Sequence, residues 1–589
     1  MKLILTLICF TIPLFSQGRF KPSQNNSDEY LRALVIFVQF SNDNSDVINW
    51  PSGKLPNYAN NIFDNKVGKK YRDSTVSDYF SKMSNGKFDF IADVYPDLVR
   101  VEKDSTYGEC NLQVLHKIDN EIKDFKKYDN WKNENGKFIF KEGNGDGYVD
   151  MLFIIYRNTD NKKFGVAGGM ANLGFSKDFL THDKLKINGS GPGIQGSGVT
   201  SIVRNKMYNA FMITPHLSHE YGHYLFGSGH TRISGLMTGE PYGYWGGTLA
   251  MSSWEKNFLG YNNFIDANSD GYTKDLRDFV KTGEAIRVSI PINNSNSGEY
   301  FLIENHQRIS MYDRVIMGGA LAGDWRPNYT IGKGIYIWYV TNGNNFPPNI
   351  VSIQADGSWD WQPAEKIVMP EGWPPTLTDI KKVQPDIYLN TGKGDRNADL
   401  LGVGAQDKWH NINPLTKKVE LTREVMGNET DAFNINYNNQ ITPWSNPSTT
   451  KLEGKKEVLT NIAIELVEQN GNNIKVKVYG KYESCLALPP SKPQSLSVEL
   501  KNNHPSLTWI SNKEPDLMKY KVYRAETNGE EPKDFKSVGE INSSSNPKMN
   551  WIDEKINIKN GNGKMFYKIS AVDKTSKESQ LSDYDWIAY

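Results

Sequence analysis

The sequence predicts a multidomain protein, with an α+β domain first, a β-rich module second and a β-sandwich at the C-terminal end. The chain has 589 residues, and at roughly 150 residues per domain this length fits three or four domains. Helical and strand patterns mix from residue 30 to about 270, whereas the pattern from 285 onward is mostly β. A Pro-rich stretch, Leu488–Pro493, precedes the last segment. The expected parts are 18–280, 281–484, a linker at 485–494, and 495–589.

The composition excludes two broad classes of protein. Lys and Arg total 68, as do Asp and Glu, so the chain lacks the bulk positive charge of a protein that wraps nucleic acid. A hydrophobic content of 38%, with 12% aromatic residues, argues against intrinsic disorder. Beyond the N-terminus no stretch reaches ~18 apolar residues. We therefore expect neither a nucleic-acid partner nor a membrane span.

The N-terminus has the pattern of a secretory signal peptide. Lys2 precedes an apolar run, Leu3–Phe15, that is too short to span a bilayer. This pattern predicts a signal peptide over residues 1–17 and an extracellular location, with a buried N-terminal strand as the alternative. Processing would leave only Cys110 and Cys485, and a disulfide bond between them is allowed but not implied.

Periodicity assigns the elements of the first domain. From Ser74 to Met83 the apolar residues return at helical spacing, which predicts a helix with Tyr79 and Phe80 on its apolar face. Residues 164–205 are rich in Gly and Ser, so we expect loops and short strands there. The other expected elements are strands at 33–41, 86–92 and 149–156 and a helix at 112–127.

The C-terminal segment has alternating strands. The alternating stretches are Leu507–Ile510, Tyr520–Arg524 and Phe566–Asp573. The segment resembles a fibronectin type III domain, because Trp509 matches the buried tryptophan of the second strand and Tyr567 lies where such sandwiches have a corner tyrosine. The resemblance implies a module that contacts substrate, extracellular matrix or cell-surface polymers, or that acts as a spacer.

Histidine is unevenly distributed, since four of the nine fall within one short window. Thr214 can cap a helix and Pro215 suits its first position, while Gly227 is a natural C-terminal stop. Between them, His219 and His223 stand four residues apart. Both rings therefore leave one helix face and can share one tetrahedral ion.

The residues of this window are those of a catalytic zinc site. The motif His-Glu-x-x-His places Glu220 beside the ion without binding it, where the carboxylate can take a proton from a water molecule. The chain turns after the helix, and His230 can return as the third ligand, which leaves the fourth position for water. His216 is interpreted as an ordinary exposed or hydrogen-bonded histidine.

Residues after the third histidine add candidates. Met237 lies in a predicted tight turn that resembles the Met-turn beneath zinc in metzincins. An ordinary core methionine is the alternative, and Met251 is a second candidate. Tyr242 and Tyr244 could each offer a hydroxyl to an oxyanion, with simple packing as the alternative.

Several stretches, in the same order, resemble the secreted immune inhibitor A family of bacterial metalloendopeptidases, peptidase family M six. They are Leu34–Ser41, Val76–Asp89, Gly145–Leu152, His219–His223, Leu249–Gly260, Glu299–Gln307, Gly334–Tyr339 and Pro443–Ser448. The resemblance covers about 33–480. It implies a metzincin-like zinc peptidase domain, and it makes the β-rich middle a companion module of the peptidase.

One departure from the family concerns the third ligand. Such proteins usually have Gly three residues after the second histidine, whereas here Phe226 takes that place and Gly227 follows. The shift fits one extra residue in the turn, with His230 seven after His223. Many relatives carry acidic residues near this position, so the spacing alone leaves the third ligand open.

Two Gly- and Asp-rich loops resemble the start of a calcium loop, because oxygen side chains alternate around glycines. The oxygen ligands would be Glu142, Asn144, Asp146 and Asp150 in one loop, and Asp266, Asn268, Asp270, Tyr272 and Asp275 in the other. Neither loop has the Glu expected at position twelve, so neither is an EF-hand. A turn that hydrogen-bonds to itself is the alternative. The sequence thus predicts calcium beside one catalytic zinc ion.

The function expected from these features is that of a secreted zinc-dependent endopeptidase acting on extracellular proteins or peptides. A rival is a non-catalytic secreted adhesin on a peptidase fold, although a degenerate site would usually have lost Glu220. A third interpretation is a zinc hydrolase that acts on a non-peptide bond.

Overall fold

The computed structural model describes residues 29–588. The gaps within that range are 44, 46, 103–104, 135–136, 158–161, 167, 192–196, 204–209, 232–234, 238–249, 293, 295, 315–331, 358, 364–379, 386–407, 413–418, 425–431, 454–455, 528–531, 533 and 559–562. The chain forms two compact units. The first comprises the chain up to His230 together with Trp254–Asn262, and the second comprises Thr231–Ser253 and the chain from Asn263 onward. The expected signal peptide lies outside the described residues.

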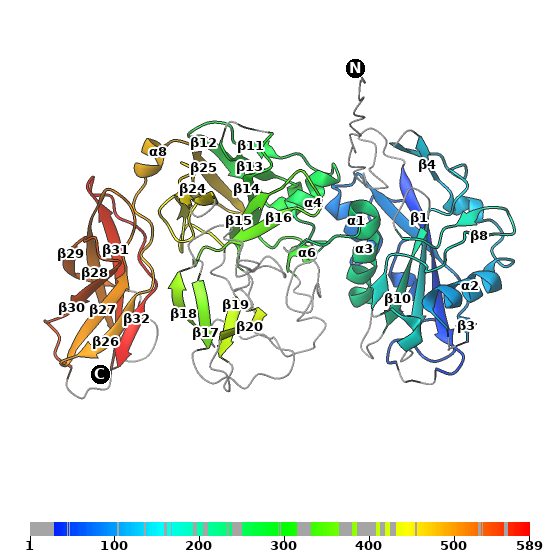
Figure 1. Ribbon diagram of the computed structural model, residues 1–589, viewed down its shortest axis with the longest axis horizontal. Coiled ribbons are helices and arrows are strands. Elements are labelled where there is room, and N and C mark those ends of the chain that lie inside the picture. Colours follow the sequence, from blue (N-terminus) through cyan, green and yellow to red (C-terminus); the bar gives the residue numbers. More distant parts are fainter. Residues whose placement is uncertain are drawn as a thin grey trace, which may run out of the picture. The chain divides into compact units, whose positions relative to one another are not determined.

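A mostly parallel sheet forms the centre of the first unit (Figure 1). Its strands run in the order β2-β1-β6-β10-β7, and β3 also pairs with β1. All of these pairings are parallel except the last, in which β7 runs antiparallel to β10 at the edge of the sheet. The strands are β1 (Tyr30–Phe40), β2 (Asp89–Val94), β3 (Val99–Val101), β6 (Met151–Arg157), β7 (Gly169–Met170) and β10 (Ser197–Val203).

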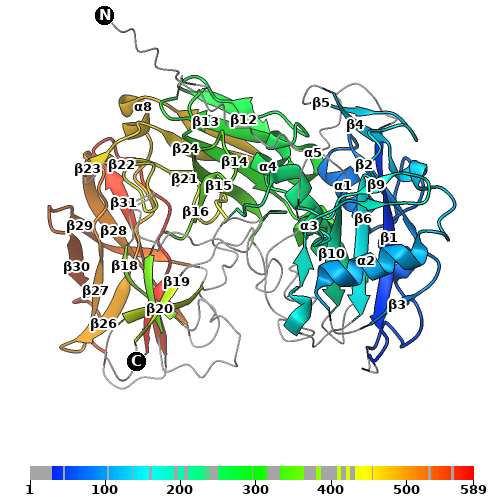
Figure 2. The same cartoon turned by 45° about the vertical axis from the view of Figure 1, so that its right-hand side comes forward.

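Helices cover both faces of this sheet (Figure 2). On one face, Val114 of α2 (Tyr107–Ile118) joins the core with Ile36 and Ile154 of the central strands. On the other face, Phe80 of α1 (Val76–Met83) and Tyr221 of α3 (Ala210–Phe226) pack against Phe90 at ring-centroid distances of 5.5 Å and 4.5 Å. Successive strand residues point to opposite faces, so the long apolar runs of β1 and β6 supply both layers.

The expected strands and the first helix of this unit are confirmed, but the helix expected at 112–127 is wrong in its bounds. It begins earlier, because Thr106 and Glu109 form a capping box at its N-terminus. Residues 125–128 form a separate 3-10 helix. The remaining elements are η1 (Ala59–Asn61), η2 (Phe125–Tyr128), β4 (Trp131–Glu134), β5 (Lys137–Phe140), η3 (Lys162–Phe164), β8 (Phe179–Leu180), β9 (Lys186–Ile187) and α4 (Ser253–Phe258).

Two sheets of the second unit share one apolar core. One sheet contains β11 (Ile265–Asp266), β13 (Ala285–Ser289), β14 (Tyr300–His306), β15 (Gly334–Thr341) and β16 (Asn349–Ile353). The other contains β12 (Tyr272–Leu276), β25 (Asn473–Tyr479), β24 (Ala463–Asn470) and β21 (Gln440–Ile441). Because β11 pairs with β13 and β12 with β25, residues 263–280 belong to this unit. The last residue of the first unit is therefore Asn262, before the expected end at 280.

Smaller elements complete this β-rich part. A four-stranded sheet runs in the order β18-β17-β19-β20, and β22 pairs with β23. The elements are β17 (Trp359–Pro363), β18 (Ile380–Pro385), β19 (Lys408–Ile412), β20 (Val419–Glu424), β22 (Lys451–Glu453), β23 (Lys456–Val458), α5 (Phe279–Thr282), α6 (Met311–Arg314) and α8 (Tyr482–Leu486).

A cluster of buried charges lies at the end of β14. The ring of His306 is 2.8 Å from a carboxylate oxygen of Glu304 and 2.9 Å from one of Asp313. Arg308 also pairs with Asp313, at 2.7 Å. All four side chains are at most 6% exposed. Glu304 in addition accepts a hydrogen bond of 2.8 Å from the backbone N–H of Ser253, so the cluster holds the segment that precedes α4.

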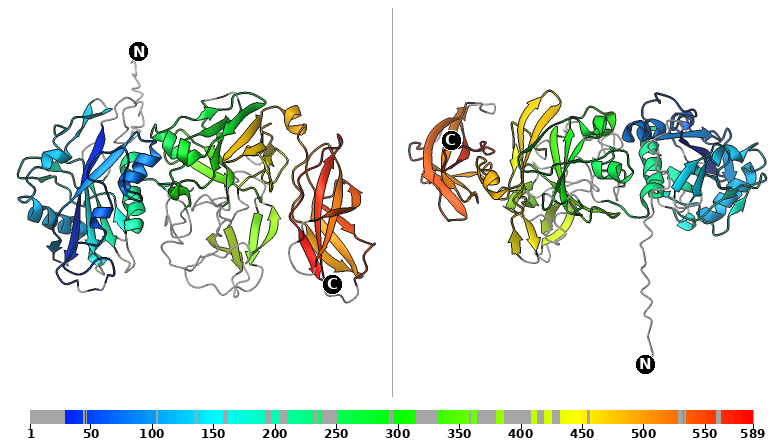
Figure 3. Two further views of the ribbon diagram at one scale, coloured as in Figure 1. Left: turned by 180° about the vertical axis from the view of Figure 1, so that it is seen from behind. Right: turned by 90° about the horizontal axis from the view of Figure 1, so that it is seen from above.

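The C-terminal part forms a β-sandwich, as expected (Figure 3). Trp509 is 1% exposed, and the buried Tyr567 hydroxyl donates to Asp553 over 3.0 Å. One sheet has the order β26-β27-β30 and the other β29-β28-β31-β32. The strands are β26 (Ser497–Lys501), β27 (His504–Ile510), β28 (Leu517–Thr527), β29 (Lys536–Asn542), β30 (Lys548–Ile552), β31 (Lys564–Asp573) and β32 (Asp585–Ala588).

The Pro-rich linker is held by side chains from both of its neighbours. Gln440 donates to the carbonyl oxygens of Pro489 and Pro490 at 3.0 Å and 3.2 Å, and Lys492 pairs with Asp583 at 2.7 Å. Cys110 and Cys485 are both buried free thiols, so the disulfide bond left open by the sequence is absent. Within the described part of the chain, every helix is too short or too polar to cross a membrane.

Candidate metal centre

Helix α3 carries the histidine motif, and it begins earlier than expected. It starts at Ala210, so Pro215 lies inside the helix and Thr214 is not its cap. The Thr214 hydroxyl donates instead to the carbonyl oxygen of Ser74 over 2.9 Å. The other end is as predicted: Gly227 takes a φ of 109°, and its N–H donates to the carbonyl oxygen of His223 over 2.9 Å.

Two tyrosines fix α3 against the sheet. Tyr221 is fully buried among the aromatic rings of Phe80, Phe88 and Phe90. The Tyr224 hydroxyl lies 2.8 Å from the carbonyl oxygens of both Ala171 and Gly198 and can donate to either. These contacts fix the position of α3 relative to the sheet, and so they also fix the position of the histidines on the opposite side of the helix.

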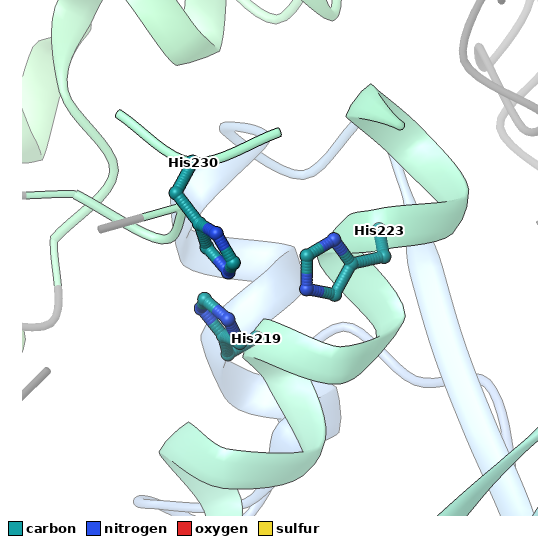
Figure 4. A group of neighbouring side chains, drawn as sticks. All are labelled: His219, His223 and His230. Carbon is teal, nitrogen blue, oxygen red and sulfur yellow. The ribbon is translucent and has the colours of Figure 1, made fainter. Parts of the chain in front are cut away.

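The three predicted ligands come together (Figure 4). One ring nitrogen from each of His219, His223 and His230 lies within 4.8 Å of the others. The rings of His219 and His230 are stacked at 5.3 Å, and His223 stands edge-on to both, at 5.1 Å and 5.0 Å. This spacing is on the scale that one shared ion requires, since each Zn–N bond is about 2.1 Å. Among the described residues, this is the group of three His, Cys, Asp or Glu side chains whose ligand atoms are placed to share one ion.

The hydrogen bond of His223 defines which nitrogen can bind a metal. Its Nδ1 lies 2.9 Å from the carbonyl oxygen of Gly227. A carbonyl oxygen can only accept, so Nδ1 carries the proton and Nε2 is left as the ligand atom. Burial, opposed by the Gly227 carbonyl, lowers the pKa of His223, and His230 lowers it further. A neutral imidazole is the form that binds metal.

Glu220 lies beside the histidine group but is not part of it. Its side chain is 8% exposed, and burial raises its pKa to about 7. A methyl group added at Gly169 of β7 would lie 2.2 Å from its Oε1 and 2.5 Å from its Cδ. The backbone of β7 therefore forms one wall of the space that holds the carboxylate. This contact could not be predicted from the sequence, where only two consecutive glycines, Gly168 and Gly169, mark the position.

His216 lies one turn before His219 and is not among the clustered ligands. Its Nε2 is buried, with no hydrogen-bond partner among the described residues. Burial lowers the pKa of His216 to about 4, against a backbone hydrogen bond with Gly168 that raises it. This histidine is neutral at ordinary pH and packs beside β7.

The other candidates near the site are described only in part. Met237 and Met251 are both fully buried, and the Met237 carbonyl oxygen accepts a 2.6 Å hydrogen bond from Thr231. The tight turn around Met237 and its role as a Met-turn therefore stay predictions. Tyr242 and Tyr244 lie outside the described residues.

The first predicted calcium loop is built around a residue that the sequence did not single out. The Asp129 carboxylate accepts hydrogen bonds from the backbone of Asp146 at 2.9 Å and of Gly147 at 3.1 Å. Asp150 accepts a bond of 2.6 Å from the Asn130 backbone. These backbone N–H groups thus donate to the carboxylates of Asp129 and Asp150, which would otherwise be available to a cation. Calcium at this loop stays a prediction.

The carboxylates of the second predicted loop have protein partners. Asp266 forms an ion pair with Arg287 at 2.6 Å. Asp270 accepts hydrogen bonds from Gly480 and Ser484, at 2.9 Å and 2.8 Å. The other predicted ligands are Glu142 and Asn144 in the first loop and Asn268, Tyr272 and Asp275 in the second. Calcium in the second loop is likewise untested.

Comparison with known proteins assigns no family. No protein-family model and no curated protein matches the chain. A solved Fn3-like protein from Clostridium thermocellum is 24% identical over 17% of this chain and 93% of that chain, with a TM-score of 0.13. The spore cortex lytic enzyme SleM from Clostridium perfringens is 19% identical over 21% of this chain and 36% of that chain, with a TM-score of 0.15. Pectate lyase Pel3 from Pectobacterium carotovorum is 21% identical over 17% of this chain and 27% of that chain, with a TM-score of 0.13. At these TM-scores the likenesses carry no argument.

Proposed function

We propose that this chain is a secreted zinc-dependent endopeptidase that hydrolyses peptide bonds of extracellular proteins. The observation that carries the proposal is the group formed by His219, His223 and His230, with Glu220 next to it on the same helix. The layers of helix, sheet and helix in the first unit support the metzincin-like domain that the immune inhibitor A-type resemblance implies. The buried Trp509 and Tyr567 support a fibronectin type III-like assignment of the C-terminal sandwich.

The donor set suits a catalytic zinc ion. Three imidazole nitrogens, with no thiolate or fourth ligand beside them in the part of the chain that the structure describes, match the open sites of zinc hydrolases. When bound, zinc supplies a Lewis acid that polarises the scissile carbonyl group and lowers the pKa of water. The Gly227 carbonyl holds His223 in the tautomer whose Nε2 would be available to bind the ion.

Glu220 moves the proton. Its carboxylate accepts a proton from the attacking water and then passes it to the amine that leaves. Its burial keeps bulk water from competing for this proton. The wall formed by Gly169 limits where the carboxylate can lie, which keeps it in place for both transfers.

Strand β7 is a surface along which a peptide substrate can lie. Among the described residues it pairs on one side only, with β10. An extended peptide can add to such an edge through main-chain hydrogen bonds, which do not depend on its side chains. This arrangement would bring a scissile bond beside Glu220, since Gly169 belongs to the same strand.

Removal of metal tests the proposal directly. We expect the purified chain to contain about one zinc ion and to cleave an unfolded protein such as reduced casein. A chelator should abolish cleavage, and added zinc should restore it. Zinc content by mass spectrometry and cleavage on gels provide the measurements. A zinc-loaded, folded chain that cleaves no protein would favour the rival adhesin, or a hydrolase of a non-peptide bond.

Gly169 provides a sharper test of the site geometry. We expect Gly169→Ala to lower kcat for a peptide substrate by about 10–100-fold, because its methyl group displaces the Glu220 carboxylate. Zinc content should not change, since the substitution leaves the three histidines in place. The matched control is Gly168→Ala, whose methyl group meets only the His216 ring, at an ordinary 3.7 Å. Equal kcat for both variants would show that β7 does not position Glu220.

A further inference from the structure

One face of the C-terminal sandwich carries exposed aromatic rings beside lysines. Along β31, Met565, Tyr567 and Ile569 point into the core, so Lys564, Phe566 and Lys568 lie on the outer face. Phe566 is buried because two rings from the neighbouring segment cover it: Tyr584 at 5.3 Å and Trp586 at 6.2 Å. We call these five residues, Lys564, Phe566, Lys568, Tyr584 and Trp586, the aromatic–lysine face.

Two rings of this face, those of Tyr584 and Trp586, remain open to solvent. Trp586 is 41% exposed and Tyr584 is 38% exposed, which is unusual for side chains that pack so well in a core. The Lys564 ammonium group lies 4.3 Å from the centre of the Trp586 ring, and Lys568 lies 5.9 Å from that of Tyr584. Apolar ring surface and positive charge therefore lie side by side on β31 and the neighbouring segment that contains Tyr584 and Trp586.

The lysines of this face differ from their neighbours on the same sheet. Lys521 pairs with Glu578 and Lys519 with Glu540, both at 2.6 Å. The positive charges of these two neighbouring lysines are therefore neutralised. Among the described residues, Lys564 and Lys568 have no carboxylate partner. The aromatic–lysine face thus keeps a positive charge that an external anion can complement.

We propose that the aromatic–lysine face binds an acidic polysaccharide. A uronic-acid polymer presents a carboxylate and an apolar C–H ring face in each repeat, which matches an ammonium group set over an indole or phenol ring. A second copy of the chain would bring the same positive charges together, which opposes self-association. Nucleic acid needs a longer basic stripe, whereas Glu540 and Glu578 border this face.

The test uses affinity electrophoresis of the full chain in gels that contain hyaluronate or neutral dextran. We expect hyaluronate alone to retard the chain, and salt to weaken this effect. Trp586→Ala, and Lys564→Gln combined with Lys568→Gln, should each weaken binding by about fivefold or more. Lys521→Gln is the matched control, since its charge is already paired, and it should bind as the wild type does.

Several outcomes would overturn this proposal. They are no retardation by hyaluronate, equal retardation by dextran, and unchanged binding by the folded Trp586→Ala chain. Tighter binding to a single-stranded oligonucleotide or to phosphatidylserine vesicles would also overturn it, by showing that another polyanion fits better. Circular dichroism of each variant confirms that the sandwich has folded. None of these results depends on zinc or on peptide cleavage.

Discussion

Replacing Glu220 by Gln is expected to reduce peptide hydrolysis by about 10²–10⁴-fold in kcat while zinc stays bound. An amide has nearly the same shape as the carboxylate but cannot accept the proton of the attacking water. Its neutral form also suits the buried position, where Glu220 is only 8% exposed. The variant should therefore fold and load zinc as the wild type does. Zinc content, KM and kcat for one quenched-fluorescence peptide provide the measurements.

The result has a clear contrary outcome. If Glu220→Gln retains wild-type kcat, another group moves the proton and the proposed mechanism is wrong. Replacing His223 by Ala is the companion variant, because it removes a ligand rather than the base. We expect His223→Ala to lose zinc together with activity, whereas Glu220→Gln should lose activity alone.

Asp313→Asn is expected to destabilise the second unit by about 3–5 kcal/mol. The substitution leaves the buried His306 and Arg308 with too little negative charge, since Asp313 contacts both at 2.9 Å and 2.7 Å. Denaturant unfolding measures the loss. The matched control is Glu468→Gln, which breaks an exposed ion pair with Lys475 and should change the free energy of unfolding far less, because exposed ion pairs contribute little. Equal losses in both variants would show that burial of the cluster is unimportant.

The same cluster predicts how stability depends on pH. Burial opposes a charge on His306, but Asp313 and Glu304 outweigh it and raise its pKa to about 9. The usual value is about 6.5. Because the folded pKa is higher, this stabilisation is fully present below about pH 6.5 and is lost as pH rises through 9. The Tyr336 ring faces that of His306 at a centroid distance of 5.2 Å, and Arg308 shares the Asp313 carboxylate with it. We expect the wild-type Tm to fall over this range, and Asp313→Asn to show a smaller fall.

The histidine site was the most predictable part of the chain. A spacing of four on a helix dictates that His219 and His223 share a face, and Gly227 gave the turn that returns His230. The predicted start of the helix at Thr214 was wrong, because the four residues before Thr214 are also helical. Local patterns thus define a motif better than they define the element that carries it.

Contacts through space were the least predictable. Strand β7 has two residues, too few for any periodicity, so the wall that Gly169 forms against Glu220 could not be inferred. The predicted domain boundary at residue 280 differs from the observed one for a related reason. Residues Tyr272–Leu276 pair with Asn473–Tyr479, and nothing in the local sequence announces a partner so distant along the chain. The buried charges around His306 could not be predicted either, because charged residues of these types usually lie on the surface.

The order in which the chain is made has a consequence for how the two units form. The first unit is interrupted after His230 and completed by Trp254–Asn262, so the excursion through Thr231–Ser253 is synthesised between its two segments. The partner that holds the end of this excursion, Glu304, emerges 51 residues after Ser253. A nascent chain can therefore present all three histidines before the excursion has its anchor. Any version of the protein cut at residue 230 would carry the metal ligands but lack the helix that completes their unit.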